Sequence, residues 1–219
     1  MTGGDPCRHT VEVSERWTEP PKVHEYVTRV GSLAPRRAGE AELLEALPGT
    51  VDSLLDLGCG DARLARLVAK AHPELTRATV TDSSEPMLEL ARCTVGSDPR
   101  FSVHEHDLHH PLQPLGMFDA VITGFAVHHV SDERKRSLFE EVLEVLEPGG
   151  VFANLEVVRC ATPSLHAEFY RRIGRTDDDP EDVLAPVEPQ LDWMRQAGLI
   201  EVDCQWRWRG FALLVGQRP

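Results

Sequence analysis

From Thr50 onward, the spacing of apolar residues alternates between two patterns, which predict strands and helices in turn. Short unbroken apolar runs are typical of strands buried on both faces, and apolar residues three and four apart are typical of amphipathic helices. The predicted strands are 51–57, 77–82, 100–107, 118–126 and 151–158, and the predicted helices are 61–73, 83–95 and 131–150. This order predicts right-handed crossovers and a mostly parallel sheet with helices on both faces.

Residues typical of helix ends support these boundaries. Helix 83–95 has a serine N-cap and Pro86 in its first turn. Helix 131–150 can be capped by Ser131 or Asp132, and its Pro-Gly-Gly sequence predicts the end of the helix.

The two flanks of this alternating region have different patterns. Before it, prolines predict helices broken at Pro20–Pro21 and Pro35, followed by a helix over Gly39–Leu47. After it, we expect a helix over 161–174, an acidic loop over 175–188 and a helix over 189–199 that ends at Gly198. Two apolar runs joined at Arg209–Gly210 then predict a terminal hairpin. We therefore divide the chain into an N-terminal helical segment, 1–48, and a main domain, 49–219.

Charge and cysteine content narrow the partners and the compartment. The formal net charge of −13 repels phosphate backbones, which argues against duplex DNA or bulk RNA as a partner. Five cysteines without a C-x-x-C pair indicate reduced thiols, so we expect a cytoplasmic protein. Because no run approaches the roughly 18 apolar residues of a membrane helix, we expect no membrane partner.

A glycine-rich turn follows the first predicted strand. Asp56, Gly58 and Gly60 form a D-x-G-x-G pattern, and a helix begins directly after it. At the carboxyl end of a parallel strand, such a turn lets a ligand approach the backbone and the free N–H groups of the helix. Dinucleotide enzymes and S-adenosylmethionine (SAM) methyltransferases both use such a turn, so the turn alone leaves both classes open.

The residues at the ends of the next strands separate these classes. Asp82 ends the second strand, Asp107–Leu108 follow the third, and the sequence FDAVITGFAVHHV contains the fourth. Taken in order over Thr50 to Phe152, this set resembles the class I SAM-dependent methyltransferases of small molecules. The resemblance implies an α/β, Rossmann-like fold with seven mostly parallel strands and a C-terminal antiparallel hairpin.

The resemblance also implies which residues bind SAM. The turn, including Cys59 as a small residue, would pack against the methionine portion, with the Gly58 backbone near the amino group. The other implied contacts are Asp82 with the ribose hydroxyls, Ser83 and Met87 with adenosine, Asp107 and the Leu108 backbone with adenine, and Gly124 and Phe125 with the sulfonium. Tyr26 and Arg36 would belong to an N-terminal lid, where an arginine grips the SAM carboxylate.

Candidate catalytic residues follow the fourth and fifth strands, where the acceptor pocket should open. His128 or His129 suits a general base at cellular pH, although a pocket-wall or capping role is the alternative. Glu156 can orient the acceptor or remain a surface acid. The segment 161–189 is expected to select the acceptor. The histidines in HEHDLHH are better explained by strand packing and by exposed loop positions than by a metal site, so we expect no metal there. Some methyltransferases of keto acids use a metal bound next to a pair of adjacent histidines, so a metal at His128 or His129 stays an open alternative.

We expect an enzyme that transfers a methyl group from SAM to a small-molecule acceptor and releases S-adenosylhomocysteine (SAH). Methylation of oxygen or nitrogen is favoured, and methylation of carbon is an alternative. A tRNA-modifying enzyme of the carboxy-SAM type and a catalytically silent SAM-binding scaffold are the rival functions, with a dinucleotide oxidoreductase disfavoured. The sequence leaves a homodimer open.

Overall fold

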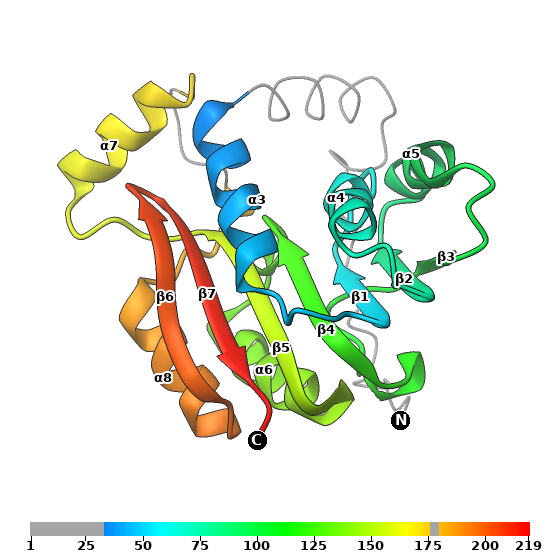
Figure 1. The fold of residues 1–219 in the computed structure, drawn as a ribbon. Coiled ribbons are helices and arrows are strands. Elements are labelled where there is room, and N and C mark those ends of the chain that lie inside the picture. Colours follow the sequence, from blue (N-terminus) through cyan, green and yellow to red (C-terminus); the bar gives the residue numbers. More distant parts are fainter. Residues whose placement is uncertain (1–32, 176–179) are drawn as a thin grey trace, which may run out of the picture.

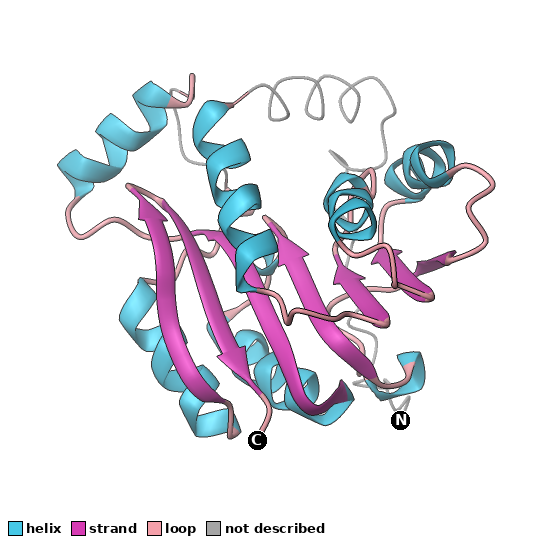
Figure 2. Cartoon of the chain, in the orientation of Figure 1, coloured by secondary structure: helices cyan, strands magenta, loops and turns pink. Residues whose placement is uncertain are grey.

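The computed structural model describes residues 33–175 and 180–219, which are built on a seven-stranded sheet (Figures 1 and 2). The strands are β1 (Ser53–Leu57), β2 (Arg77–Asp82), β3 (Phe101–Glu105), β4 (Phe118–Gly124), β5 (Leu146–Val157), β6 (Ile200–Trp208) and β7 (Phe211–Gln217). Their order in the sheet is β3-β2-β1-β4-β5-β7-β6. The first five are parallel, and β7 runs antiparallel to β5 and β6. The predicted fold class is confirmed, including the terminal hairpin.

Helices cover both faces of this sheet (Figure 1). One face carries α3 (Ala34–Ala46), α4 (Arg63–Ala71) and α5 (Glu85–Val95), and the other carries α6 (Asp132–Val145) and α8 (Val187–Ala197). The helix α7 (Pro163–Arg172) packs on the β6–β7 turn through Phe169, and two short 3₁₀ turns, η1 (Gln113–Leu115) and η2 (Val127–His129), flank β4. None of the helices in the described ranges is long and apolar enough to cross a bilayer.

Residue alternation along the strands explains why the apolar runs are unbroken. In β1, Leu54 packs into the core on the α3–α4 face, and the next residue, Leu55, packs into the core on the α6–α8 face. Successive side chains of a strand point to opposite faces, so a strand covered on both faces needs apolar residues at every position. Because β1 to β5 are parallel, their carboxyl ends lie at one edge of the sheet, where the polar residues Asp56, Asp82 and Glu156 occur.

Helix ends follow the predicted caps, with two differences at prolines. Side chains of Ser84 and Ser131 accept hydrogen bonds from the first turns of α5 and α6. The helix α6 ends at Val145, earlier than predicted, because 146–150 already belongs to β5 and carries a register shift against β4. In contrast to the predicted break, Pro35 lies in the first turn of α3, where its missing N–H costs nothing.

The described part of the N-terminal segment packs directly on the sheet. In α3, a Cβ on Gly39 would lie 2.7 Å from Leu155 in β5 and 2.8 Å from the Trp206 ring in β6, so the helix and sheet are in close contact. Leu43 of this helix is fully buried in the core. Tyr26, predicted to belong to the lid, lies outside the described residues.

Candidate active site

The glycine turn between β1 and α4 adopts a backbone that glycine accommodates best. Gly58 has φ +63°, Gly60 has φ +54°, and Ala62 follows in the left-handed region at φ +57°. A Cβ on Gly58 would lie 2.3 Å from the Cβ of Ala126, which follows β4. The turn therefore lies close against the end of β4, and a side chain at Gly58 has no room.

Asp82 holds this turn in place from the end of β2. Its Oδ2 accepts a hydrogen bond from the Gly60 N–H at 2.9 Å, and its Oδ1 accepts one from the Ser84 N–H at 2.9 Å. The Cys59 N–H also donates to the Thr81 carbonyl at 2.8 Å. Burial raises the pKa of Asp82, and the backbone N–H donors oppose that rise. The carboxyl group therefore joins the turn to the β2–α5 connection.

Asp56, at the end of β1, is a fully buried acid. Neither of its carboxyl oxygens has a hydrogen-bond partner among the described residues. Burial raises the pKa of Asp56 to about 8, and the negative charges of Asp82 and Asp61 add to this rise. The backbone N–H of Ala65 favours the ionised carboxylate and so opposes this rise in pKa, but it does not form a hydrogen bond with Asp56. A cationic ligand group beside Asp56 would favour its ionised form and lower this pKa.

The raised pKa of Asp56 predicts that stability falls as pH rises. Between about pH 4 and pH 8 the folded chain keeps a proton on Asp56 that the unfolded chain has lost, so the folded state binds more protons. This group lowers the free energy of unfolding by at most about 1.4 kcal/mol per pH unit. In urea denaturation from pH 5 to pH 8, Asp56→Asn should lose this slope.

Asp192→Asn, on the exposed surface of α8, is the matched control for that experiment and should keep the wild-type slope. Equal slopes for wild type and Asp56→Asn would contradict the assigned protonation of this group.

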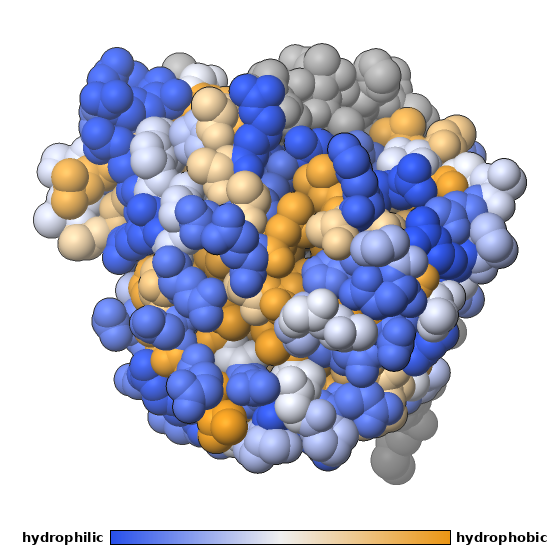
Figure 3. All heavy atoms as spheres, in the orientation of Figure 1, coloured by the Kyte–Doolittle hydropathy of each residue, from blue (hydrophilic) through white to orange (hydrophobic). Residues whose placement is uncertain are grey.

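A recess lies beside the glycine turn, between α3, α4 and the ends of β4 and β5. It is lined by Arg36, Glu40, Asp56, Gly58, Cys59, Asp61, Arg63, Leu64, Gly124, Phe125 and Leu155. Figure 3 shows apolar atoms in the furrow between α3 and α4, with polar residues over much of the visible face. The recess therefore combines an apolar floor with charged walls, a combination typical of ligand sites.

Charged residues from two helices meet at this recess. The buried carboxylate of Glu40 accepts a hydrogen bond from Arg36 Nε at 3.1 Å and also contacts Arg63 at the start of α4. The Arg36 guanidinium lies 4.9 Å from the centre of the Phe125 ring. Phe125 has φ +60°, a strained conformation for a bulky residue, and its N–H donates to the Leu155 carbonyl. Arg36 therefore lines the recess beside Phe125, and its contact with the SAM carboxylate stays a prediction.

The residues predicted to bind adenosine lie at the ends of β2 and β3. Met87 is buried in α5, and Ser83 is partly exposed. Asp107 accepts hydrogen bonds from the backbone and the ring of His109, and these contacts outweigh its partial burial and lower its pKa. The Leu108 carbonyl accepts a bond from Arg134. The topology places all of these at one sheet edge, while their contacts with a ligand stay predictions.

The other predicted histidines lie near this edge. His104, His109 and His110 are exposed, and His106 is half-buried, with its ring 6.4 Å from that of His110 in an edge-to-face arrangement.

His128 and Glu156 form a buried pair just beyond the recess. His128 lies in η2 after β4, and Glu156 lies next to Leu155 in β5. The Glu156 carboxylate accepts hydrogen bonds from the His128 ring at 2.5 Å, the His128 N–H at 2.9 Å and the Val157 N–H at 2.6 Å. Burial disfavours the charged ring, but Glu156 and Asp182 outweigh burial and raise the pKa of His128.

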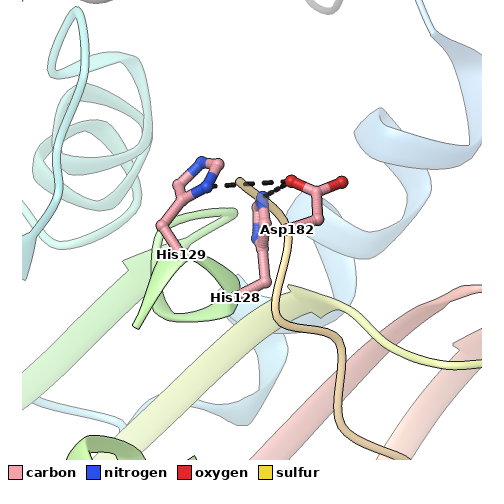
Figure 4. Close-up of side chains that lie close together, drawn as sticks. All are labelled: His128, His129 and Asp182. Atoms are coloured by element: carbon pink, nitrogen blue, oxygen red, sulfur yellow. Dashed lines mark ion pairs between the residues drawn. The ribbon is translucent and has the colours of Figure 1, made fainter. Parts of the chain in front are cut away.

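Asp182 is a site residue that the sequence analysis did not single out. It lies in the loop before α8, and its side chain is only 4% exposed. Its Oδ1 is 3.4 Å from His128 Nε2 and 3.7 Å from His129 Nδ1. Figure 4 shows the three side chains directed toward one another. Its position in an acidic, proline-containing segment predicted a loop, and no local pattern distinguishes it from its acidic neighbours.

Comparison with known proteins identifies the domain in which most of these residues lie. The family described as a methyltransferase domain matches residues 54–150, which contain the glycine turn, Asp82, Asp107 and both histidines. The chain thus matches a methyltransferase domain over residues 54–150.

Three relatives share parts of this methyltransferase domain. A methyltransferase of Mycobacterium bovis without an assigned reaction is 34% identical over 124 residues, covering 56% of this chain and 58% of that protein. A carboxy-S-adenosyl-L-methionine synthase of Chromohalobacter salexigens is 28% identical, covering 73% and 66%. The 6-hydroxytryprostatin B O-methyltransferase of Aspergillus fumigatus is 31% identical, covering 74% and 45%. The matched region thus spans little more than half of the Mycobacterium protein.

A solved methyltransferase has the same fold. The SAM-dependent methyltransferase SibL, in its apo form, superimposes with a TM-score of 0.69 at 26% identity, covering 91% of this chain and 62% of that one. The likeness therefore extends beyond the methyltransferase domain match to the terminal helix and hairpin.

Proposed function

We propose that this protein transfers a methyl group from SAM to an oxygen or nitrogen atom of a small-molecule acceptor. The observation that carries the proposal is that the Asp82-clamped glycine turn and the His128–Glu156 pair share one sheet edge. Gly58 of the turn packs on Ala126, only two residues before His128. A cofactor cradle and a polar pair suited to proton transfer therefore adjoin each other.

The recess fits the charges of SAM. Asp56 is a buried acid without a described hydrogen-bond partner, and it lines the same recess as Arg36. Asp56 suits the cationic amino end of SAM, and Arg36 suits its carboxylate. Glu40 accepts the Nε–H of Arg36, and the other N–H groups of the guanidinium are the ones that would donate to the SAM carboxylate. Gly58, whose missing Cβ makes room for Ala126, keeps the turn close against the end of β4, beside the recess.

The remaining cofactor residues are assigned by their place at the same edge. Asp82 would hold the ribose hydroxyls while it clamps the turn, with Ser83 and Met87 beside the adenosine. Asp107 and the Leu108 backbone would meet the adenine, and Gly124, Cys59 and Phe125 would border the sulfonium.

The histidines and Glu156 would serve the acceptor. SAM supplies a methyl group on a cationic sulfur, which leaves with the electrons of the broken S–C bond as SAH. The protein must align the acceptor atom with that bond and accept or release its proton. One Glu156 oxygen contacts Nδ1 of the His128 ring, and the carboxylate also accepts the backbone N–H groups of His128 and Val157. His129 is the more exposed neighbour, with 28% of its side chain accessible. The name of the Aspergillus relative supports a hydroxyl acceptor.

Binding and turnover test the proposal separately. Calorimetric titration should show saturable binding of SAH and SAM and no binding of NAD. A panel of phenols, hydroxyindoles and amines, with SAM carrying a labelled methyl group, should then yield labelled product. Glu156→Gln should lower kcat at least about 100-fold, because the carboxylate that orients His128 is lost, and should change SAH affinity less than about threefold.

The rival functions give different results. Binding of SAH without labelled product from any acceptor would favour a silent scaffold. Turnover only with carboxy-SAM, on a tRNA acceptor, would favour the tRNA-modifying alternative, for which the Chromohalobacter relative is the supporting comparison. Absence of SAH binding would overturn the proposal.

A further inference from the structure

We infer that His128, His129 and Asp182 form a binding site for a divalent first-row transition-metal ion. The three side chains converge from two segments far apart in the chain (Figure 4). One potential ligand atom from each, two imidazole nitrogens and a carboxylate oxygen, lies within 4.8 Å of the others.

The separations match those of atoms that share a metal ion. Ligands at 2.0–2.1 Å from a tetrahedral ion lie about 3.3 Å from one another. His128 Nε2 is 3.4 Å from Asp182 Oδ1, and His129 Nδ1 is 3.7 Å from the same oxygen. Small side-chain rotations are therefore enough to place all three atoms around one ion.

Glu156 prepares His128 to act as a ligand. Because the Glu156 carboxylate already accepts two backbone N–H groups, it is set to accept the ring proton of His128 at Nδ1 as well. A proton on Nδ1 leaves the lone pair on Nε2, the atom that faces Asp182. A carboxylate that orients a metal-binding histidine in this way is a common arrangement in metal sites.

Contacts outside the cluster fix the loop that carries Asp182. The N–H of the next residue, Val183, donates to the His128 carbonyl at 2.7 Å, and its own carbonyl accepts a bond from Lys135 Nζ at 2.5 Å. Lys135 is buried in α6 and also contacts Asp132 at 2.9 Å. The loop is therefore joined to η2 and to α6 by contacts that do not use the Asp182 side chain, so the ligand is held in advance.

The charges around the cluster leave room for a cation. Glu156 and Asp182 bring two carboxylates to the two histidines, and neither Lys135 nor Arg175 is placed against Oδ1 of Asp182. Lys135 is held by Asp132 and the Val183 carbonyl, and Arg175 is 3.4 Å from Oδ2 of Asp182, the oxygen that does not face the histidines. Oδ1 is therefore the oxygen directed to the ion.

The donor set indicates the class of metal and of acceptor. Two imidazoles and one carboxylate suit zinc, iron, cobalt, nickel or copper, whereas magnesium and calcium prefer oxygen ligands. Three protein ligands leave coordination positions free for an exogenous ligand. If the proposed function holds, on which this step rests, the ion would bind the acceptor through oxygen and favour its deprotonated form. The acceptor class is then a phenol, enol or other oxygen-donor compound.

The test is metal binding by the full chain, without any acceptor. After chelator treatment, titration with Co²⁺, followed by visible absorption, and with Zn²⁺, followed by calorimetry, should each show one equivalent. Mg²⁺ should show none. His129→Ala and Asp182→Asn should weaken binding at least about 100-fold, since each removes a ligand. His110→Ala removes an exposed histidine on another loop and should bind like wild type.

Three results would overturn the site: no saturable Co²⁺ or Zn²⁺ binding by wild type, unchanged affinity in both ligand variants, or an equal loss in His110→Ala. Thermal melting and SAH titration of each variant identify one that has not folded, and His129→Ala, at the more exposed ligand, keeps the test valid if Asp182→Asn unfolds. SAH binding and turnover by a wild-type protein that shows no saturable Co²⁺ or Zn²⁺ binding would overturn this inference and leave the proposed function intact. Metal binding without SAH binding would support the metal site and overturn the proposed function.

Discussion

Replacing Asp82 with alanine is expected to weaken SAH binding at least about 100-fold, which corresponds to about 2.8 kcal/mol. Two effects add in this variant. The Gly60 and Ser84 N–H groups lose their common acceptor, so the glycine turn loses the clamp that joins it to β2. The proposed acceptor for the ribose hydroxyls is lost as well. Calorimetric titration with SAH measures the combined effect.

Asp82→Asn separates the clamp from the ribose contact. The side-chain oxygen of asparagine can accept one of the two N–H bonds, but its NH₂ group cannot accept the other, so the loss should lie between wild type and alanine. Asp192→Ala, which removes an exposed acid paired with Arg195, is the matched control and should bind SAH like wild type. Wild-type affinity in Asp82→Ala would show that the ligand does not bind at this turn.

Gly58→Ala is expected to abolish SAH binding and to lower the melting temperature. The new Cβ would lie 2.3 Å from the Cβ of Ala126, closer than any two such atoms can approach, and φ of +63° adds about 1–2 kcal/mol for a residue with a Cβ. The turn must therefore move away from the end of β4, where the recess lies. Gly49→Ala, where a Cβ meets nothing within 4 Å, should behave like wild type.

A second substitution tests whether the clash with Ala126 is the cause. Ala126→Gly removes the Cβ that the new methyl group would meet, so the double variant should recover part of the stability and the SAH affinity. Recovery should be incomplete, because the backbone strain at position 58 remains. A double variant no better than Gly58→Ala would assign the whole effect to the backbone conformation instead.

The secondary structure and the turns of this protein could be predicted, because short stretches of sequence encode them. The alternation of strands and helices follows from the spacing of apolar residues, which each element needs in order to bury one or both faces. The glycine turn could be predicted because a turn with positive φ needs glycine at defined positions directly after a strand. Asp82 could be predicted from its place at the end of the second strand. The caps of α5 and α6 follow from Ser84 and Ser131 for the same local reason.

Residues that meet only through packing could not be predicted. The contact of Glu40 with Arg63 depends on how α3 lies against α4, and the raised pKa of Asp56 depends on its complete burial. The strained backbone of Phe125 depends on its hydrogen bond to Leu155 in the neighbouring strand. None of these leaves a periodic or spacing signal.

The sequence by itself determined the fold class and the placement of the glycine turn, Asp82 and Asp107 at strand ends, because these depend on local patterns repeated at the ends of parallel strands. Only the tertiary structure decided how His128, His129 and Asp182 come together. Asp182 reaches His128 and His129 because Val183 pairs with the His128 carbonyl and Lys135 holds the same loop. Such contacts join segments distant in the chain, and their geometry follows from the packing of α6 and the loop before α8.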